Sequence, residues 1–131
     1  MEETKPDRFN DQIRDRTMNM ATGVCRMFHG KTLSMALRPA VNQVIRSSSS
    51  VAANYRAAAR ARSEAEYYAK ICIVVEECDE TQFWFDYLSK TDVLDFQINP
   101  LVYNEIVELL KIFSSIKRKM REKIESRAGK R

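Results

Sequence analysis

The side chains best suited to chemistry in this sequence are its positive charges, which are grouped in two blocks. Residues 38–62 contain five arginines and no acidic residue, and residues 117–131 contain eight basic and two acidic residues. Clustered lysine and arginine side chains neutralise phosphate groups without reading base sequence. The blocks therefore indicate a surface for an anionic partner, although a solvated basic face is the commoner fate of such runs. The candidate nucleic-acid-binding residues are Arg56, Arg60, Arg62, Lys117, Arg118, Lys119, Arg121 and Lys123.

A polar stripe forms a second candidate site. Its members in residues 43–54 are spaced to share one face of a helix, and an acidic cluster follows in residues 76–80. The stripe and the cluster are consistent with a ligand site or with a buried network that fixes helix register, and we favour the structural interpretation. The predicted polar network comprises Gln43, Arg46, Ser50, Asn54, Glu76, Asp79 and Glu80.

Other site chemistries find little support in the residue pattern. His29 is the only histidine, and Cys72 and Cys78 are too far apart in sequence for a zinc motif. Glu76 and Glu80 share a helix face, but a di-iron bundle also needs Glu-x-x-His motifs, which this sequence does not contain. No serine has the context of a catalytic triad, and no glycine-rich phosphate loop occurs. We therefore predict no metal, no cofactor and no enzymatic activity.

Composition limits the classes of protein to consider. The chain has 131 residues, enough for one domain, and its 44% hydrophobic and 31% charged residues are ordinary for a folded protein. Three glycines and three prolines leave few turns, which favours long helices over a sandwich or barrel. Residues 1–6 lack an apolar signal core, and no apolar run approaches the roughly 20 residues of a membrane span. With three cysteines, an odd number, the expected location is the reducing cytoplasm, with no membrane partner.

Apolar periodicity and capping residues predict the elements that position these side chains. Gly30 suits a left-handed helix end, and Asn99 followed by Pro100 is typical of a helix start. Ser63 and Glu66 have the spacing of a capping box, so one helix is expected to end just before Ser63. The predicted fold class is all-α, a single four-helix-bundle domain. The predicted helices span about residues 7–28, 38–62, 63–90 and 99–125, and the predicted flexible tails are residues 1–6 and 126–131.

The centre of the third predicted helix indicates self-association. Residues 71–75 are apolar on every side of the helix, which is typical of a helix buried all round. A four-helix monomer leaves each helix one solvated side, so a neighbouring subunit is the simplest cover. The predicted oligomer interface comprises Ile71, Val74, Val75 and Trp84.

A spaced motif across residues 43–84 carries a resemblance to a known family. It reads Gln43-x-x-Arg46-Ser47-x-x-Ser50-Val51-x-x-Asn54, then Ala65-Glu66-Tyr67, then Ile73-x-x-Glu76-x-x-Asp79-Glu80-Thr81-x-Phe83-Trp84. Over residues 13–120 the chain resembles the bacterial four-helix-bundle family named for members encoded in intervening sequences of 23S ribosomal RNA genes. The resemblance implies an antiparallel up-down bundle and a homopentamer with a central channel.

The resemblance also has implications for function. A related protein is the accessory protein of diversity-generating retroelements, which binds nucleic acid and works with a reverse transcriptase. The family as a whole has no established enzymatic activity, and its ribosomal name does not place its members in the ribosome. Many members carry Glu-Gly shortly after the asparagine of the motif, where this chain has Ala57 and Ala58. Any role of that glutamate is therefore absent here, and the helix is expected to continue smoothly.

Together these observations predict a non-enzymatic, oligomeric nucleic-acid-binding protein that uses its basic surface, with structured RNA favoured over DNA. The alternative is a protein-interaction scaffold whose basic surface docks an acidic protein. The expected partners are other copies of the chain and either RNA or DNA.

Overall fold

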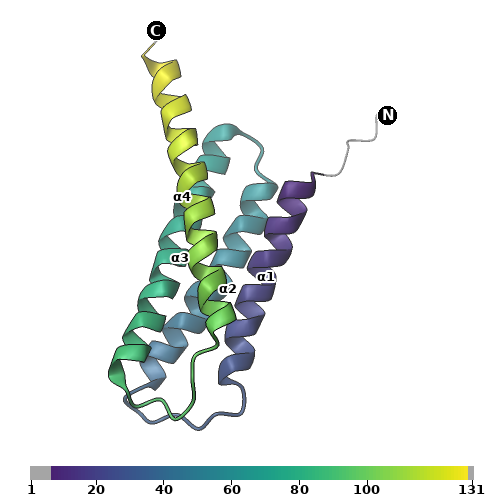
Figure 1. Cartoon of the computed structure of the whole chain (residues 1–131). Helices are drawn as coiled ribbons and strands as arrows, with labels where there is room; N and C mark the ends of the chain where they lie inside the picture. The colour runs from purple at the N-terminus through teal and green to yellow at the C-terminus, as the bar shows by residue number, and fades with distance from the viewer. Residues whose placement is uncertain (1–6, 130–131) are drawn as a thin grey trace.

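Four helices run alternately up and down in the computed structural model, which describes residues 7–129 (Figure 1). The prediction of an all-α, antiparallel up-down four-helix arrangement is confirmed. The predicted flexible tail at residues 1–6 and the last two residues, 130–131, lie outside the described residues. The helices are α1 (Arg8–Phe28), α2 (Arg38–Ala59), α3 (Glu64–Thr91) and α4 (Pro100–Ala128).

The helix boundaries follow from the capping residues that the sequence indicated. The Ser63 hydroxyl accepts a hydrogen bond of 3.1 Å from the backbone N–H of Glu66, one half of the predicted capping box. The Asn99 side chain accepts one of 3.0 Å from the N–H of Leu101. Gly30, just after α1, has a φ of +73°, a left-handed conformation that glycine adopts without strain.

Two helix ends differ from the prediction. Helix α2 ends at Ala59, because Arg60 leaves helical geometry and its N–H bonds to carbonyls three and two residues earlier. Arg60 and Arg62 consequently lie in the α2–α3 turn. Helix α4 continues to Ala128, so residues 126–128 are helical and not a flexible tail. No helix-breaking residue precedes Gly129, whose N–H still bonds to the helical carbonyl of Glu125 at 2.9 Å.

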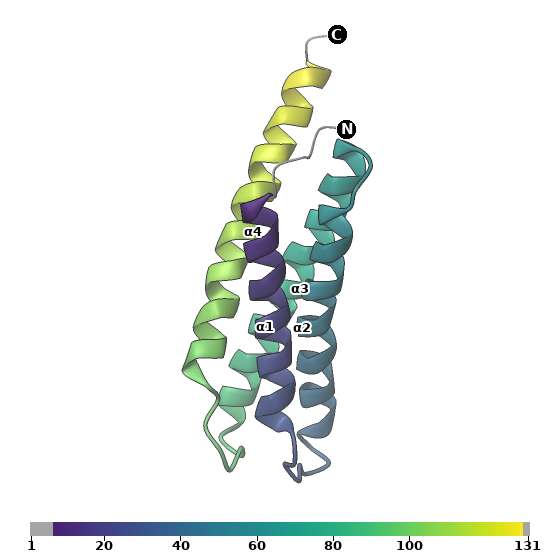
Figure 2. The ribbon, with the colours of Figure 1, turned by 90° about the vertical axis from the view of Figure 1, so that its right-hand side faces the viewer.

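The hydrophobic core runs along the axis of the bundle. Helix α2 packs against both α1 and α3, α3 also packs against α4, and the contact between α1 and α4 is the smallest of the four. In the view of Figure 2, α1 stands in front, with α4 on one side and α2 on the other. The largest wholly buried side chains are Tyr55, Phe85 and Phe113, from three different helices. The rings of Tyr55 and Phe113 are 5.4 Å apart and join α2 to α4 through the core.

Burial in the core corrects the predicted oligomer interface. Ile71 and Val74 have no exposed surface within a single chain, so they cannot contact a neighbour. Helix α3 contacts both α2 and α4, and this wide buried face accounts for much of its apolar centre. Val75 and Trp84 are half-buried against the core. These two predicted residues therefore keep surface that a neighbour could contact, and the most exposed apolar side chains of α3 are Ile73, Phe83 and Tyr87.

Candidate nucleic-acid interface

The predicted basic residues gather at one end of the bundle. The α2–α3 turn and the last turns of α4 lie at this end, and α4 extends beyond the turn (Figures 1 and 2). Beyond Phe113, no residue of α4 up to Ala128 is fully buried. We call this region the basic end, and it comprises the eight predicted residues Arg56, Arg60, Arg62, Lys117, Arg118, Lys119, Arg121 and Lys123, all exposed except the half-buried Lys117.

A shallow groove joins the turn to α4. It has a volume of about 410 Å³, and Arg62, Tyr67 and Met120 are among the residues that line it. Tyr67 is half-buried, and this burial raises the pKa of its hydroxyl. The hydroxyl can donate a hydrogen bond in this groove, which Arg62 also lines.

A second groove brings an arginine of α1 to the basic end. Arg14 of α1 lines a cavity of about 240 Å³ together with Arg56 and Arg60. Arg14 is not among the binding residues predicted from the sequence. Because α1 and α2 are antiparallel neighbours, the start of α1 lies beside the end of α2. The expected antiparallel order of the two helices was therefore the sequence signal that could have placed Arg14 beside Arg56 and Arg60. Arg14 also donates a hydrogen bond of 3.0 Å to Asp11, so part of its charge is balanced locally.

One acidic residue binds the projecting part of α4 to the rest of the bundle. Glu64, at the start of α3, forms an ion pair of 2.6 Å with Lys123 and a second ion pair with Arg127. The hydrogen bond from Lys123 holds the pKa of Glu64 below its usual value. By contrast, the structure gives no acidic partner within residues 7–129 to four cations of this segment, namely Lys117, Arg118, Lys119 and Arg121.

Three members of the predicted polar network, Gln43, Arg46 and Glu80, form an ion cluster with Glu77 on the surface and not a buried network. The half-exposed Arg46 guanidinium donates to Glu80 at 2.6 Å, to Glu77 at 3.3 Å and to Gln43 at 3.0 Å. The bond to Glu80 raises the pKa of Arg46, and the same bond lowers the pKa of Glu80. Burial raises the pKa of Glu77 despite the nearby arginine, because loss of water outweighs the attraction at this less exposed carboxylate.

The other predicted members lie outside that cluster. Asn54 donates a hydrogen bond of 2.9 Å to the Ser50 hydroxyl, forming a separate local contact within α2. Glu76 and Asp79 are exposed, and the structure shows no side-chain hydrogen bond for either within residues 7–129. Glu77 contacts Arg46 in their place, because successive residues of a helix point about 100° apart around its axis.

The buried polar contact between α2 and α3 is formed by Ser47 and Thr81, neither of which is in the predicted polar network. The hydroxyls of Ser47 and Thr81 are 2.8 Å apart, and both residues are wholly buried. Thr81 also donates to the carbonyl of Glu77, so both hydroxyls are satisfied without a charge. Ser47 lies three residues after Val44 and four before Val51, on the same apolar face of the helix. This position in the apolar repeat was the sequence signal for its burial.

The described residues offer little for catalysis or metal binding. Within residues 7–129, no group of three or more histidine, cysteine or acidic side chains is placed to hold a metal ion. Burial raises the pKa of the Cys78 thiol to about 12, so this cysteine is not a thiolate nucleophile at neutral pH. Over the same part of the chain, no helix combines the length and apolar character needed to cross a membrane.

The chain matches a protein family in sequence and a solved structure in fold. The profile of a family described as 23S rRNA-intervening sequence protein matches residues 10–115. A solved structure is similar along most of its length, a crystal structure of a protein of unknown function from the S23 ribosomal protein family of Bacteroides thetaiotaomicron. The two are 23% identical with a TM-score of 0.70, over 83% of this chain and 97% of that one, which supports the shared fold. A search of curated proteins found no match.

Proposed function

The chain belongs to the 23S rRNA-intervening sequence protein family, and we propose that this member is a non-enzymatic protein that binds structured RNA through its basic end. The observation that supports the proposal most is the grouping of eight separately predicted cations at one end of the bundle. The four cations within residues 117–121 have no acidic partner within the described residues, so their charge is available to phosphates.

The proposed mechanism is phosphate neutralisation without base reading. Arginine and lysine side chains on a projecting helix and an adjoining turn can follow a curved phosphate backbone. The aromatic side chains are poorly placed for stacking, since Trp84 is half-buried and donates its indole N–H to Glu80 at 3.3 Å. About five phosphate contacts predict roughly 100- to 500-fold weaker binding at 200 mM than at 50 mM salt. Sequence preference is expected to be weak.

The test is titration of a labelled RNA hairpin at these two salt concentrations with two variants of equal charge change. Absence of binding by the unmodified chain at low salt would refute the proposal, and so would equal weakening by both variants. Loss of affinity and of salt slope in the first variant alone would support it. The test variant replaces Lys117, Arg118, Lys119 and Arg121 by glutamine, and the control variant replaces Arg26, Arg38, Lys90 and Lys111 by glutamine.

We propose in addition that the chain forms a homo-oligomer, for which the family resemblance implies five copies. The support is the exposed apolar surface of α3, where Phe83 is 54% and Tyr87 44% exposed. The Phe83 ring also packs edge-on against Trp84, with ring centres 4.9 Å apart. Light scattering at micromolar concentration is expected to give a multiple of the 15.2 kDa chain mass. A monomer mass refutes oligomerisation, and Phe83→Ser with Tyr87→Ser is expected to lower the mass of a true oligomer.

A second candidate function is a scaffold that docks an acidic protein on the same end. The observation in its favour is apolar surface among the cations of α4, where Met120 is half-buried and Ile124 is 36% exposed. An amphipathic basic helix of this kind also suits a protein partner. A pulldown that enriches one protein and persists after nuclease treatment would favour this function over RNA binding.

A further inference from the structure

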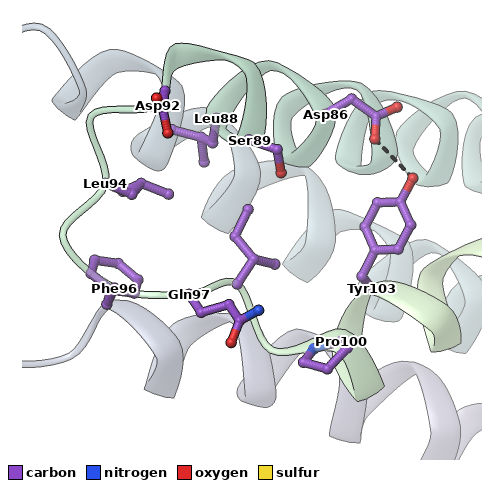
Figure 3. Close-up of a pocket in the computed structure, with 10 residues that line it drawn as sticks. Asp86, Leu88, Ser89, Asp92, Leu94, Phe96, Gln97, Pro100 and Tyr103 are labelled. Carbon is purple, nitrogen blue, oxygen red and sulfur yellow. Dashed lines mark hydrogen bonds between the residues drawn. The ribbon is translucent and has the colours of Figure 1, made fainter.

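A pocket of about 530 Å³ lies at the end of the bundle opposite the basic end, between the last turns of α3 and the start of α4 (Figures 1 and 3). Its volume is within the range of about 300–1,000 Å³ that is usual for small-molecule sites. Leu88, Leu94, Phe96 and Ile98 give it an apolar lining, and Leu88 is almost completely buried. The pocket is separate from every residue assigned to RNA binding.

The loop that forms the pocket is held in place by contacts on its other side. Asp92 ends α3 in a left-handed conformation, with a φ of 55°, and the chain crosses to α4 through residues 92–99. The Phe96 ring packs edge-on against Phe28 of α1, with ring centres 5.7 Å apart. The Lys31 ammonium lies 4.7 Å from the centre of the same ring. These contacts join the part of the loop around Phe96 to α1 and to the segment that follows it.

The charged groups of the lining are all negative and stand apart. Asp86 and Asp92 are the two charged residues among the ten drawn, and they lie at opposite ends of the pocket (Figure 3). The Tyr103 hydroxyl donates to one oxygen of Asp86 at 2.8 Å. Neither carboxylate has a basic ion-pair partner within residues 7–129. Asp92, the C-cap of α3, is six positions after Asp86, which corresponds to a rise of roughly 9 Å along the helix axis.

We propose that this pocket binds a linear aliphatic diamine. One protonated amine would pair with each carboxylate, and the methylene chain between them would lie on the apolar side chains of Leu94 and Ile98. A carboxylate accepts charge-assisted hydrogen bonds from an ammonium group, and two such contacts with an apolar spacer discriminate against ligands with one charge. The Gln97 side chain, also in the lining, supplies an amide oxygen as a further acceptor.

The test is calorimetric titration of the full-length, nucleic-acid-free protein with three ligands of the same chain length: 1,5-diaminopentane, 1-aminopentane and 1,5-pentanediol. The diamine is expected to bind about tenfold more tightly than the monoamine, and the diol more weakly than both. Equal affinity for the diamine and the monoamine, or no heat with the diamine at millimolar concentration, overturns the proposal.

Three matched substitutions locate the binding. Asp86→Asn keeps an oxygen to accept from Tyr103, and Asp92→Asn keeps a residue type that tolerates the left-handed conformation. Each is expected to reduce diamine affinity to about the level of the monoamine, roughly tenfold. Asp95→Asn removes the same charge from the same loop outside the pocket lining and should leave the affinity unchanged. If all three variants weaken binding equally, the ligand responds to net charge and the site assignment is wrong.

Discussion

The two halves of α4 form one regular helix, yet different forces act on them. In the first half, Ile106, Leu109 and Phe113 are wholly buried in the core. In the second half, from Lys117 to Ala128, no residue is buried and charged side chains predominate. Core packing therefore constrains which residues can occupy the first half. The second half needs only residues that are compatible with a helix. Helical regularity alone therefore does not distinguish a structural segment from a surface available to a partner.

The largest expected effect is on stability, in the first half. Phe113→Ala removes a wholly buried ring that contacts Tyr55, and a loss of about 3–5 kcal/mol in the free energy of unfolding is expected. Urea denaturation measures this loss. The matched change in the second half, Ile124→Ala, should cost less than about 1 kcal/mol because that side chain is already partly exposed. Comparable losses at the two positions would remove the distinction between the halves.

The next effect is on function, in the second half. A chain that stops after Ile116 loses eight basic residues and none of the buried ones. Its unfolding free energy is expected to fall by at most about 2 kcal/mol, because only exposed and half-buried contacts are removed. RNA affinity at 50 mM salt should fall by about 100-fold. Gel-shift titration and circular dichroism on the same sample separate the outcomes, and unfolding of the shortened chain would show that the second half is structural.

A smaller effect is expected where α1 contacts the first half of α4. Arg16 donates to both oxygens of Glu105, at 2.5 and 3.1 Å, and these bonds raise the pKa of Arg16. Both side chains are about one-third exposed, so solvent screens the pair. Arg16→Met should therefore cost about 1 kcal/mol of unfolding free energy, with RNA affinity unchanged. A change in affinity would mean that the two halves are coupled.

The smallest effect concerns the ion pairs of Glu64 with the second half. The folded pKa of Glu64 is below its unfolded value, so its contribution to stability is present above the unfolded pKa and disappears as the pH falls through the folded pKa. Glu64→Gln is expected to remove that acid dependence by removing, at neutral pH, the small contribution that these exposed ion pairs make to stability. The same variant frees Lys123 and Arg127, so RNA affinity should rise by about two- to threefold. Weaker RNA binding would show that the ion pairs are needed to orient the helix.

Features that depend on a single helix could be predicted from the sequence. The spacing of Ile106, Leu109 and Phe113 marks the buried face of α4, and Ser63 marks the start of α3. Features that depend on how two helices pack against each other were harder to predict from the sequence. Ile71 and Val74 were predicted to face a neighbouring subunit, because periodicity does not reveal that α3 contacts both α2 and α4.

The candidate site shows the same limit. The cations of the basic end could be selected by counting charges, and their positions at one end follow from the up-down order. Arg14 was missed because its neighbours come from α2, and its own surroundings in sequence are balanced by Asp11 and Asp15. Which acid Arg46 would meet depends on the rotation of α3, which selects Glu77 over Glu76.

The small contact between α1 and α4 has a consequence for the order of folding. The other helix contacts join neighbours in the chain, so each can form by closing one short loop. The contact of Arg16 with Glu105 joins residues 89 positions apart and completes the ring of four helices. From this contact pattern we expect folding to begin at the α2–α3 hairpin, with the α1–α4 closure as the last and entropically most costly step. The native bundle is therefore also expected to open first along that seam, from which the basic helix projects.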